Sequence, residues 1–281
     1  MPSPFDSIAR DYDAVFTHTA LGQLMRQRVR DLYRTGGFGR RITIATDEIQ
    51  SADKTAGTVL EINCGTGDDA IWLARQGWRV LATDISPEMV AVTDEKARQA
   101  GFGDRIESRV CSFADVEHLE GCFDLVWSNF GGLNCISPEE IERFAPVLSK
   151  KLKPGGAFVA VVMSRFCWWE TLYFTLKGNG SAAFRRRSRK PVDGRLDENT
   201  TLPTWYYSPR EFRSLFKNLT AERILPAGFW LPPSYLNPFF EKRPRWLQLL
   251  YFMERRCTPG LLAGASDHFF IEFEHTAPAI K

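Results

Sequence analysis

The sequence predicts an α/β fold in which helices cover both faces of a mostly parallel sheet. Short apolar runs alternate with amphipathic helical segments between residues 57 and 163, a pattern typical of βαβ units with right-handed crossovers. A turn containing Gly65 and Gly67 follows the first apolar run and precedes a helical segment. A last apolar segment, 268–273, alternates with a period of two residues and predicts a further strand.

The elements follow in chain order from periodicity and from end signals. Residues 5–35 carry apolar side chains three and four apart and predict one helix, which Thr35-Gly36-Gly37 ends. Serine followed by proline begins two later helices, at Ser86 and Ser137, because serine caps a helix and proline fits its first position. The expected strands are 59–62, 79–83, 105–110, 123–128, 157–163, 221–225 and 268–273. The expected helices after the first are 68–76, 87–100, 138–152, 165–176 and 209–217.

Three stretches lack a regular pattern. Residues 38–56 are polar, and we expect a loose connection there. Residues 226–266 are rich in proline and aromatic residues and are too long for a plain loop, so we expect an insertion with short helices. The basic run 185–190 favours a solvated loop, while an anionic acceptor or peripheral contact with a membrane surface stays open as its partner.

Composition narrows the function classes. The 281 residues carry 36 basic and 34 acidic side chains, which argues against a protein that binds nucleic acid through bulk charge. We expect no transmembrane segment, because the apolar stretches are too short, and no secretory signal, because the N-terminus lacks an apolar region. Six cysteines without a CxxC motif or a completing His pair predict reduced thiols, no metal site and a cytoplasmic location.

The turn at Gly65 and Gly67 is the strongest functional signal. Glycine lets a ligand approach the backbone where a Cβ would clash, and the helix that follows presents backbone N–H groups. Asp84, at the end of the second expected strand, can accept hydrogen bonds from both hydroxyls of a ribose. Glu61, just before the turn, suits a ligand with an ammonium group better than a pyrophosphate. A dinucleotide stays open as the alternative ligand.

These residues resemble class I S-adenosylmethionine-dependent methyltransferases. The matching segments, in chain order, are FDSIARDYDAVF, VLEINCGTG, VLATDISPEMV, FDLVWSNFGGLNCI and LKPGGAFVAVV. The first of them is similar to the branch that includes ubiquinone/menaquinone-type and related small-molecule enzymes. One departure is Asn63, where the family has glycine; asparagine is the residue that best tolerates a left-handed backbone after glycine. The resemblance implies a Rossmann-like class I methyltransferase fold with a mostly parallel, seven-stranded sheet and an antiparallel last strand.

The resemblance also implies a binding site for S-adenosyl-L-methionine. Glu61 would hold the cofactor ammonium, Asp84 the ribose hydroxyls and Arg26 the carboxylate, while Ile85 and Met89 would flank the adenine. Core packing for Met89 and a solvated helix face for Arg26 stay open as alternatives. The predicted cofactor-binding residues are Tyr12, Arg26, Glu61, Asn63, Gly65, Gly67, Asp84, Ile85, Met89, Ser112, Phe113, Asn129, Phe130 and Gly131.

The sequence does not single out a catalytic residue. Methyl transfer from a sulfonium is an in-line displacement, and a base is needed only where the nucleophile must lose a proton. The candidates are Tyr12, His18 and Asn129. Tyr12 would close over the site, with an aromatic staple as its alternative, and His18 has a surface or capping role as its alternative.

The acceptor is expected to lie under the later insertions. We expect one methyltransferase domain over 1–281, with an N-terminal helical cap (1–37), a cofactor-binding core (57–163) and insertions 164–208 and 226–266 as the acceptor-site lid. The aromatic residues of these insertions are Trp168, Trp169, Tyr173, Trp205, Tyr206, Tyr207, Phe229, Trp230, Tyr235, Phe239 and Phe240. They favour a small apolar, aromatic or lipid-like acceptor, although packing onto the core is their alternative role.

The predicted function is therefore S-adenosylmethionine-dependent methyl transfer to a small molecule. A nicotinamide-dependent oxidoreductase and a non-catalytic cofactor-binding protein are the alternatives. The acceptor, the methylated atom and the oligomeric state stay open, because carbon, oxygen and nitrogen acceptors share this fold.

Overall fold

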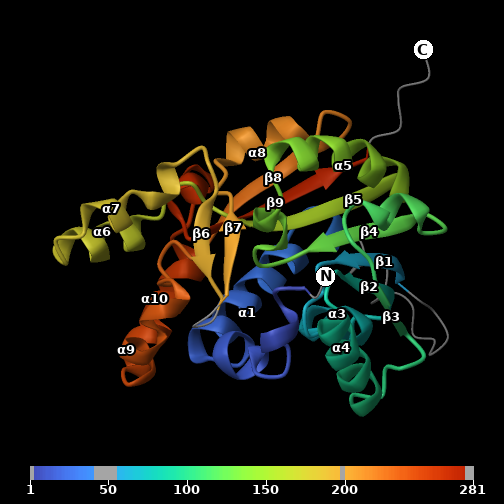
Figure 1. The fold of residues 1–281 in the computed structure, drawn as a ribbon, viewed down its shortest axis with the longest axis horizontal. Helices are drawn as coiled ribbons and strands as arrows, with labels where there is room; N and C mark the ends of the chain where they lie inside the picture. Colours follow the sequence, from blue (N-terminus) through green and yellow to red (C-terminus); the bar gives the residue numbers. More distant parts are fainter. Residues whose placement is uncertain (1–2, 41–55, 197–199, 276–281) are drawn as a thin grey trace.

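The computed structural model describes residues 3–40, 56–196 and 200–275 (Figure 1). Most of the loose connection expected at 38–56 lies outside the described residues. The main sheet has seven strands in the order β3-β2-β1-β4-β5-β9-β8. These strands are β1 (Gly57–Ile62), β2 (Trp78–Asp84), β3 (Ile106–Val110), β4 (Phe123–Ser128), β5 (Leu152–Met163), β8 (Thr220–Ala227) and β9 (His268–Glu274).

The strand directions confirm the predicted fold class. β9 pairs antiparallel with both β5 and β8, and every other pairing in this sheet is parallel. The parallel strands therefore end at one edge of the sheet, where the loops after β1, β2, β3 and β4 meet. The predicted ligand-binding turn lies at this edge.

Helices cover both faces of the sheet, as predicted. Alternate residues of a strand point to opposite faces, so Val59 joins one core cluster and Leu60 the other. The first cluster contains residues of α1 (Ala20–Arg34), α3 (Asp68–Arg75) and α4 (Pro87–Gln99). The second contains residues of α5 (Pro138–Lys151) and α8 (Pro209–Leu215). Figure 1 shows these two helix groups on either side of the strands.

The expected caps are present at the helix starts. The Met89 N–H donates to Ser86 Oγ over 3.1 Å at the start of α4. Ser137 and Ser208 each form a reciprocal capping box with the glutamate three residues later. These helices begin where the sequence predicts because the capping bonds join residues only three apart.

The prediction of one continuous helix over residues 5–35 is wrong. The structure has a 3-10 turn, η1 (Asp6–Ile8), a π turn, η2 (Asp13–Thr17), and then α1 from Ala20. Thr19 separates η2 from α1: its backbone is extended, with ψ 154°, and its side chain accepts from the Gly22 N–H over 3.0 Å. The end predicted at Thr35 is confirmed, because α1 stops at Arg34.

The first insertion contains more regular structure than the sequence predicts, while the second contains short helices, as predicted. The first holds α6 (Trp168–Leu176), α7 (Gly180–Ala183), η5 (Arg185–Arg187) and an unexpected ribbon of β6 (Val192–Arg195) and β7 (Thr201–Thr204). The second holds η6 (Ser234–Leu236), α9 (Asn237–Glu241), α10 (Pro244–Arg256) and η7 (Gly260–Ala265). Figure 1 places α6, α7, α9 and α10 together at the left end of the molecule, while β2 and β3 lie on the right. Two short 3-10 turns lie between core elements: η3 (Asp115–His118) between β3 and β4, and η4 (Gly132–Cys135) between β4 and α5.

Candidate functional site

The turn after β1 has the left-handed backbone that its residues predict. The φ angles of Asn63, Gly65 and Gly67 are 54°, 56° and 76°. The Asn63 side chain also joins this turn to β4, because its Nδ2 donates to the Asn129 carbonyl over 3.0 Å and its Oδ1 accepts from Ser128 Oγ over 2.7 Å. Asparagine here combines the conformation that glycine would adopt with two bonds that glycine cannot form.

The two glycines of the turn have different surroundings. A Cβ placed on Gly65 would have nothing within 4 Å, so this residue borders open space. A Cβ placed on Gly67 would come within 2.6 Å of the Thr93 side chain on α4. Gly65 therefore leaves room for a ligand beside the backbone, whereas Gly67 allows α3 and α4 to pack closely.

Asp84 ties the ends of β1 and β2 together. Its two carboxylate oxygens accept from the Gly65 N–H and the Ser86 N–H, each over 2.9 Å. Burial raises the pKa of Asp84, and these backbone donors oppose the rise. A carboxylate has about four acceptor positions, so two bonds to the backbone leave capacity for ligand hydroxyls.

The expected adenine neighbours differ in exposure. Ile85 directly after Asp84 is 55% exposed, while Met89 is 1% exposed and lies in the core. In the loops after β3 and β4, the predicted residues also have protein partners. Ser112 Oγ donates to Asp115 over 2.6 Å, and the Phe113 ring meets Phe144 edge-on at 5.4 Å. Ile85 thus offers apolar surface for a ring beside Asp84, and the adenine contacts stay predictions.

Glu61 is a buried acid with an unsatisfied oxygen. It is 2% exposed, and its Oε2 has no hydrogen-bond partner among the described residues. Burial, together with the negative charge of Asp69, raises the pKa of Glu61 well above its ordinary value, although Arg26 opposes the rise. An unpaired buried acceptor is costly, so this oxygen suits a cationic donor from a ligand.

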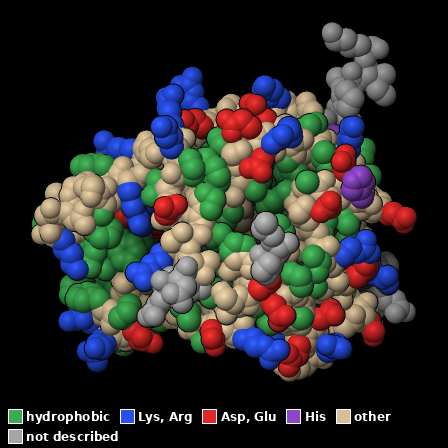
Figure 2. Space-filling model, in the orientation of Figure 1, with side chains coloured by type: hydrophobic (Ala, Val, Ile, Leu, Met, Phe, Trp, Pro, Cys, Tyr) green, Lys and Arg blue, Asp and Glu red, His purple; other side chains and the backbone are tan. Residues whose placement is uncertain are grey.

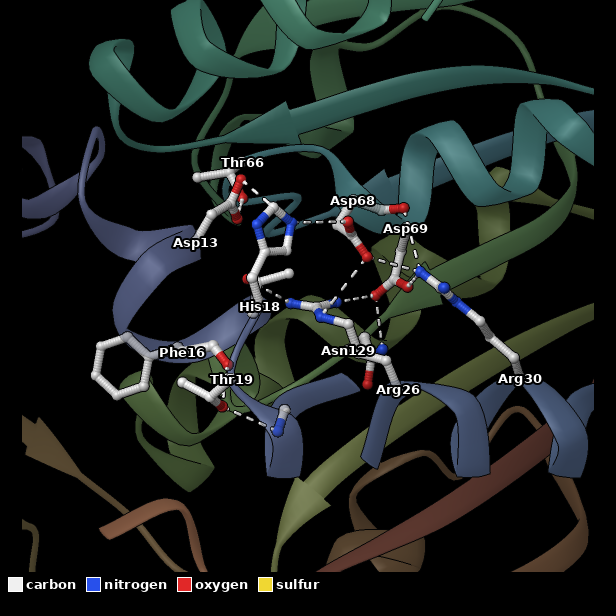
Figure 3. Close-up of polar contacts among 12 residues, drawn as sticks. Asp13, Phe16, His18, Thr19, Arg26, Arg30, Thr66, Asp68, Asp69 and Asn129 are labelled. Atoms are coloured by element: carbon white, nitrogen blue, oxygen red, sulfur yellow. Dashed lines mark hydrogen bonds and ion pairs between the residues drawn. The ribbon is translucent and has the colours of Figure 1, made fainter. Parts of the chain in front are cut away.

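Asp69 is the centre of a polar cluster that also contains Arg26, Arg30 and Asn129 (Figure 3). The sequence did not predict Asp69 as a site residue. Its Oδ2 accepts from Arg26 Nη1 and from Asn129 Nδ2, each over 2.6 Å, and its Oδ1 accepts from Arg30 Nη2 over 3.0 Å. Burial would raise the pKa of Asp69, but Arg26 and Arg30 hold it below its ordinary value. The available signal was a pair of acids directly after Gly67, in the first turn of α3.

Two predicted residues belong to this cluster. Arg26 also lies over the Phe130 ring, 5.1 Å from its centroid, so it faces the protein interior and not solvent. A role for Arg26 toward the cofactor carboxylate stays a prediction. Asn129 has a buried Oδ1 without a hydrogen-bond partner in the described part of the chain. Among the described residues, the cluster and the nearby Glu61 therefore have two buried acceptor atoms without a partner, Glu61 Oε2 and Asn129 Oδ1, and one such donor, Arg30 Nε.

The N-terminal segment lies against the turn. Asp13 accepts from Thr66 Oγ1 over 2.6 Å and from Lys96 Nζ over 2.5 Å. The neighbouring Tyr12 is half-buried. Burial raises the pKa of its hydroxyl, the positive charge of Arg26 lowers it, and the negative charge of Asp84 raises it further. His18 is 55% exposed, and its Nε2 lies 4.0 Å from Asp13 and 3.9 Å from Asp68 (Figure 3). Tyr12 thus lies within the influence of the site charges, while His18 lies at the rim.

The loop after β4 is shaped by two left-handed residues. Phe130 and Gly131 have φ angles of 47° and 87°. Phe130 is the unusual one, because a bulky side chain at positive φ is strained. Its ring also meets His268 edge-on at 5.5 Å, so this loop links the predicted ligand-binding edge of the sheet to the start of β9.

The aromatic residues of the insertions divide into two groups. Tyr206 and Tyr207 are buried, and the Tyr207 hydroxyl donates to the Ile136 carbonyl over 2.9 Å, so this pair packs onto the core. Trp169 instead packs with Leu231 in a cluster that also contains Leu21 of α1 and Phe130. Part of the second insertion is therefore held against α1 and the loop after β4.

The prediction that residues 185–190 form a solvated loop is wrong for Arg185 and Arg186. Arg186 is 7% exposed and bonds to Glu170 and Asp267, and Arg185 also pairs with Glu170 over 2.8 Å. The partner acids lie on α6 and before β9, far from the run in sequence. Arg187, Arg189 and Lys190 are exposed, as expected.

The assembled site has a defined chemistry. It lies at the carboxyl ends of β1 and β2. Glu61 is a buried acid whose Oε2 has no partner among the described residues, Gly65 leaves an open position, and Asp84 can still accept hydrogen bonds. Such a set is complementary to a ligand that carries an ammonium group and vicinal hydroxyls. S-adenosylmethionine fits this description, and Glu61 and Asp84 are the residues that would hold it.

Comparisons with known proteins agree with this chemistry. Residues 59–156 match a family model described as a methyltransferase domain. A ubiquinone/menaquinone biosynthesis C-methyltransferase from Acidiphilium cryptum is 32% identical over 165 residues, which cover 57% of each chain. A ribosomal protein L11 methyltransferase from Pelobacter propionicus is 35% identical over 102 residues, 36% of this chain and 30% of that one.

A solved structure shows the same fold. It is a SAM-dependent methyltransferase from Methanosarcina mazei, with a TM-score of 0.53 and 16% identity, and the match covers 84% of this chain and 98% of that one. The chain spans little more than half the length of the first curated relative and less than a third of the second. Residues 59–156 therefore form a methyltransferase domain, and the strand order and the solved structure give the chain a Rossmann-like methyltransferase fold.

Proposed function

We propose that this protein transfers a methyl group from S-adenosylmethionine to a small apolar, aromatic or lipid-like acceptor by in-line displacement. The observation that carries the proposal is the buried Glu61 carboxyl at the end of β1, whose Oε2 has no partner among the described residues. The turn that follows has an open position at Gly65. A dinucleotide pyrophosphate would place negative charge near Glu61, Asp69 and Asp84, whereas the ammonium of S-adenosylmethionine would neutralise it.

The chain's own residues would bind and position the reactants. Glu61 would accept from the cofactor ammonium, and Asp84 would use its remaining acceptor positions for the ribose hydroxyls. The bound cofactor supplies an already activated methyl group, so alignment and exclusion of water are the protein's main tasks. Burial raises the pKa of the Tyr12 hydroxyl, which favours its neutral form, and this hydroxyl would donate a hydrogen bond to a reactant.

The domain roles form part of the same proposal. Residues 1–37 would act as a cap, which the bonds of Asp13 to Thr66 and Lys96 support. Residues 57–163 would bind the cofactor, and 164–208 and 226–266 would cover the acceptor. Packing of Trp169 and Leu231 near Phe130 supports this arrangement of the second insertion. The similarity to a relative named ubiquinone/menaquinone biosynthesis C-methyltransferase supports an acceptor with an aromatic ring or a lipid-like chain.

Calorimetric titration with S-adenosylhomocysteine, and separately with NADH, tests the cofactor assignment. We expect micromolar binding of S-adenosylhomocysteine and none of NADH. Binding of NADH alone would overturn the proposal in favour of an oxidoreductase. Transfer of labelled methyl groups to a panel of aromatic and lipid-like compounds then tests the reaction. A protein that binds the cofactor and methylates none of them would contradict the proposed acceptor class.

A further inference from the structure

The outward face of α10 is apolar and exposed. Leu247 and Glu254 of this helix are buried, and Tyr251 donates to Asp31 of α1, so this side of α10 faces the protein. The opposite face presents Trp246, Leu249 and Phe252, which are 63%, 50% and 58% exposed. Residues three apart share one face of a helix, and in a globular protein the face turned to solvent is normally polar.

Neighbouring elements extend this apolar surface. Contacts between aromatic rings join α6 to η6 through Tyr173 and Tyr235 at 5.6 Å, and α6 to α9 through Trp169 and Phe240 at 6.0 Å. Together these elements form an apolar end, made up of the exposed residues Leu172, Leu176, Tyr235, Phe239, Trp246, Leu249 and Phe252. Figure 2 shows hydrophobic side chains gathered at the left end of the molecule, where Figure 1 places these helices.

Exposed basic side chains lie on or next to the elements of the apolar end. They are Lys177 after α6, Lys242 and Arg243 between α9 and α10, and Arg245 and Arg256 on α10, while Arg255 of α10 pairs with Asp31 over 3.2 Å. Of the three acids on α6, α9 and α10, Glu170 and Glu254 are buried and only Glu241 is exposed. Glu254 accepts from the Gly228 and Trp230 N–H groups, so its charge points inward. The solvent-facing charge around the apolar residues is therefore mainly positive.

We propose that the apolar end docks on the surface of an anionic lipid bilayer. Exposed Trp246, Phe252 and Leu176 would enter the headgroup region, while the surrounding arginines and lysines would face lipid phosphates. A second copy of the chain fits less well, because a two-fold interface would join this patch to itself and bring two sets of basic side chains together. The inference rests on this surface alone and does not depend on the proposed methyl transfer.

Sedimentation of the full chain with vesicles tests the proposal. We compare phosphatidylcholine vesicles with vesicles that also contain phosphatidylglycerol. We expect binding to the mixed vesicles, weakened by salt, and at least about tenfold weaker binding to phosphatidylcholine alone. The double variant Trp246→Glu/Phe252→Glu should lose at least about tenfold in binding, and Arg245→Gln/Arg256→Gln should lose the preference for anionic lipid.

Val110→Glu is the matched control. Val110 is 51% exposed at the end of β3, on the edge of the sheet away from β8, so its change should leave vesicle binding unaltered. The substituted positions are exposed, and each variant should keep the parent's unfolding transition. Failure of the parent to bind mixed vesicles would overturn the proposal, as would equal binding by the double variant. A dimer by light scattering that the double variant dissociates would assign the surface to a second copy instead.

Discussion

Two buried charge clusters in this protein differ in how completely their charges are paired. At the proposed cofactor site, Asp69 pairs with Arg26 and Arg30, and the nearby Glu61 has an Oε2 without a hydrogen-bond partner among the described residues. Within the first insertion, Arg186 Nη2 bonds to Glu170 over 2.9 Å, and it also bonds to Asp267 before β9 over 2.7 Å. The free oxygen in the first cluster is where a cationic ligand would complete the pairing.

The second cluster is closed by its neighbours. Arg185 bonds to Glu170, and no carboxylate oxygen of Glu170 or Asp267 is a buried acceptor without a partner among the described residues. His268 Nδ1 lies 3.1 Å from Asp267 Oδ2 as an ion-pair contact and forms no hydrogen bond with a described residue. Burial would raise the pKa of Asp267, but His268 and Arg186 hold it well below its ordinary value. Removing one partner of a closed buried cluster leaves a buried charge unpaired and destabilises the fold, whereas an open cluster contains an unpaired group until a ligand binds. Changes in the second should therefore affect stability, and changes in the first should affect binding.

The largest expected effect is on the closed cluster. Arg186→Met leaves Glu170 and Asp267 buried without their main partner and should lower the free energy of unfolding by about 3–5 kcal/mol. Urea unfolding measures this loss. Arg187→Met, at the exposed neighbouring residue, should change stability by no more than about 0.5 kcal/mol. Equal effects of the two changes would contradict the closed cluster's structural role.

Glu61→Gln tests the open cluster. The amide cannot neutralise an ammonium, so affinity for S-adenosylhomocysteine should fall at least about tenfold, or about 1.4 kcal/mol. Affinity for adenosine, which lacks the ammonium, should change much less. Stability should change little, because the variant removes an acid that burial already disfavours. Calorimetry with both ligands measures the difference, and equal losses for the two would refute the ammonium role.

Asp84→Ala provides the complementary result. Since Asp84 is predicted to bind the ribose, affinities for S-adenosylhomocysteine and adenosine should both fall by at least about tenfold. The Gly65 and Ser86 N–H groups also lose their acceptor, so urea unfolding must show that the variant is folded. Unchanged affinity in the folded variant would reject the ribose assignment.

The pH dependence should follow the raised pKa of Glu61. A ligand ammonium favours the ionised carboxylate, so affinity for S-adenosylhomocysteine should fall as the pH falls through this pKa. Stability has the opposite sign: the contribution of the neutral buried carboxyl is present below its ordinary pKa and is lost as the pH rises through the raised one. Titrations across pH measure both trends, and Glu61→Gln should flatten them. A pH profile that this variant leaves unaltered would assign the titration to another group.

The smallest effect is expected at Asn63. Asn63→Gly relieves a left-handed backbone but loses the bonds to Ser128 and Asn129, so the net change in unfolding free energy should stay within about 1 kcal/mol. Asn63→Ala keeps the strain and loses both bonds, and it should be the less stable variant by urea unfolding. If alanine were as stable as glycine, neither the backbone angle nor the bonds would explain the asparagine.

The sequence by itself determined which strands and helices follow one another along the chain around the turn at Gly65 and Gly67. Serine and proline at 86–87 and 137–138, and glycine at 65 and 67, act within a few residues, so their effects can be read locally. The same locality let the sequence place Glu61 and Asp84 at the ends of β1 and β2.

The tertiary structure alone decided how the distant side chains pair. Arg26 meets Asp69 across 43 residues, Asn129 meets Asp69 across 60, and Arg186 meets Asp267 across 81. Local periodicity carries no information about such partners, because burial and pairing depend on how remote elements pack. For this reason the basic run was predicted as a solvated loop although Arg186 is buried, and the first helix was predicted without the break that Thr19 introduces.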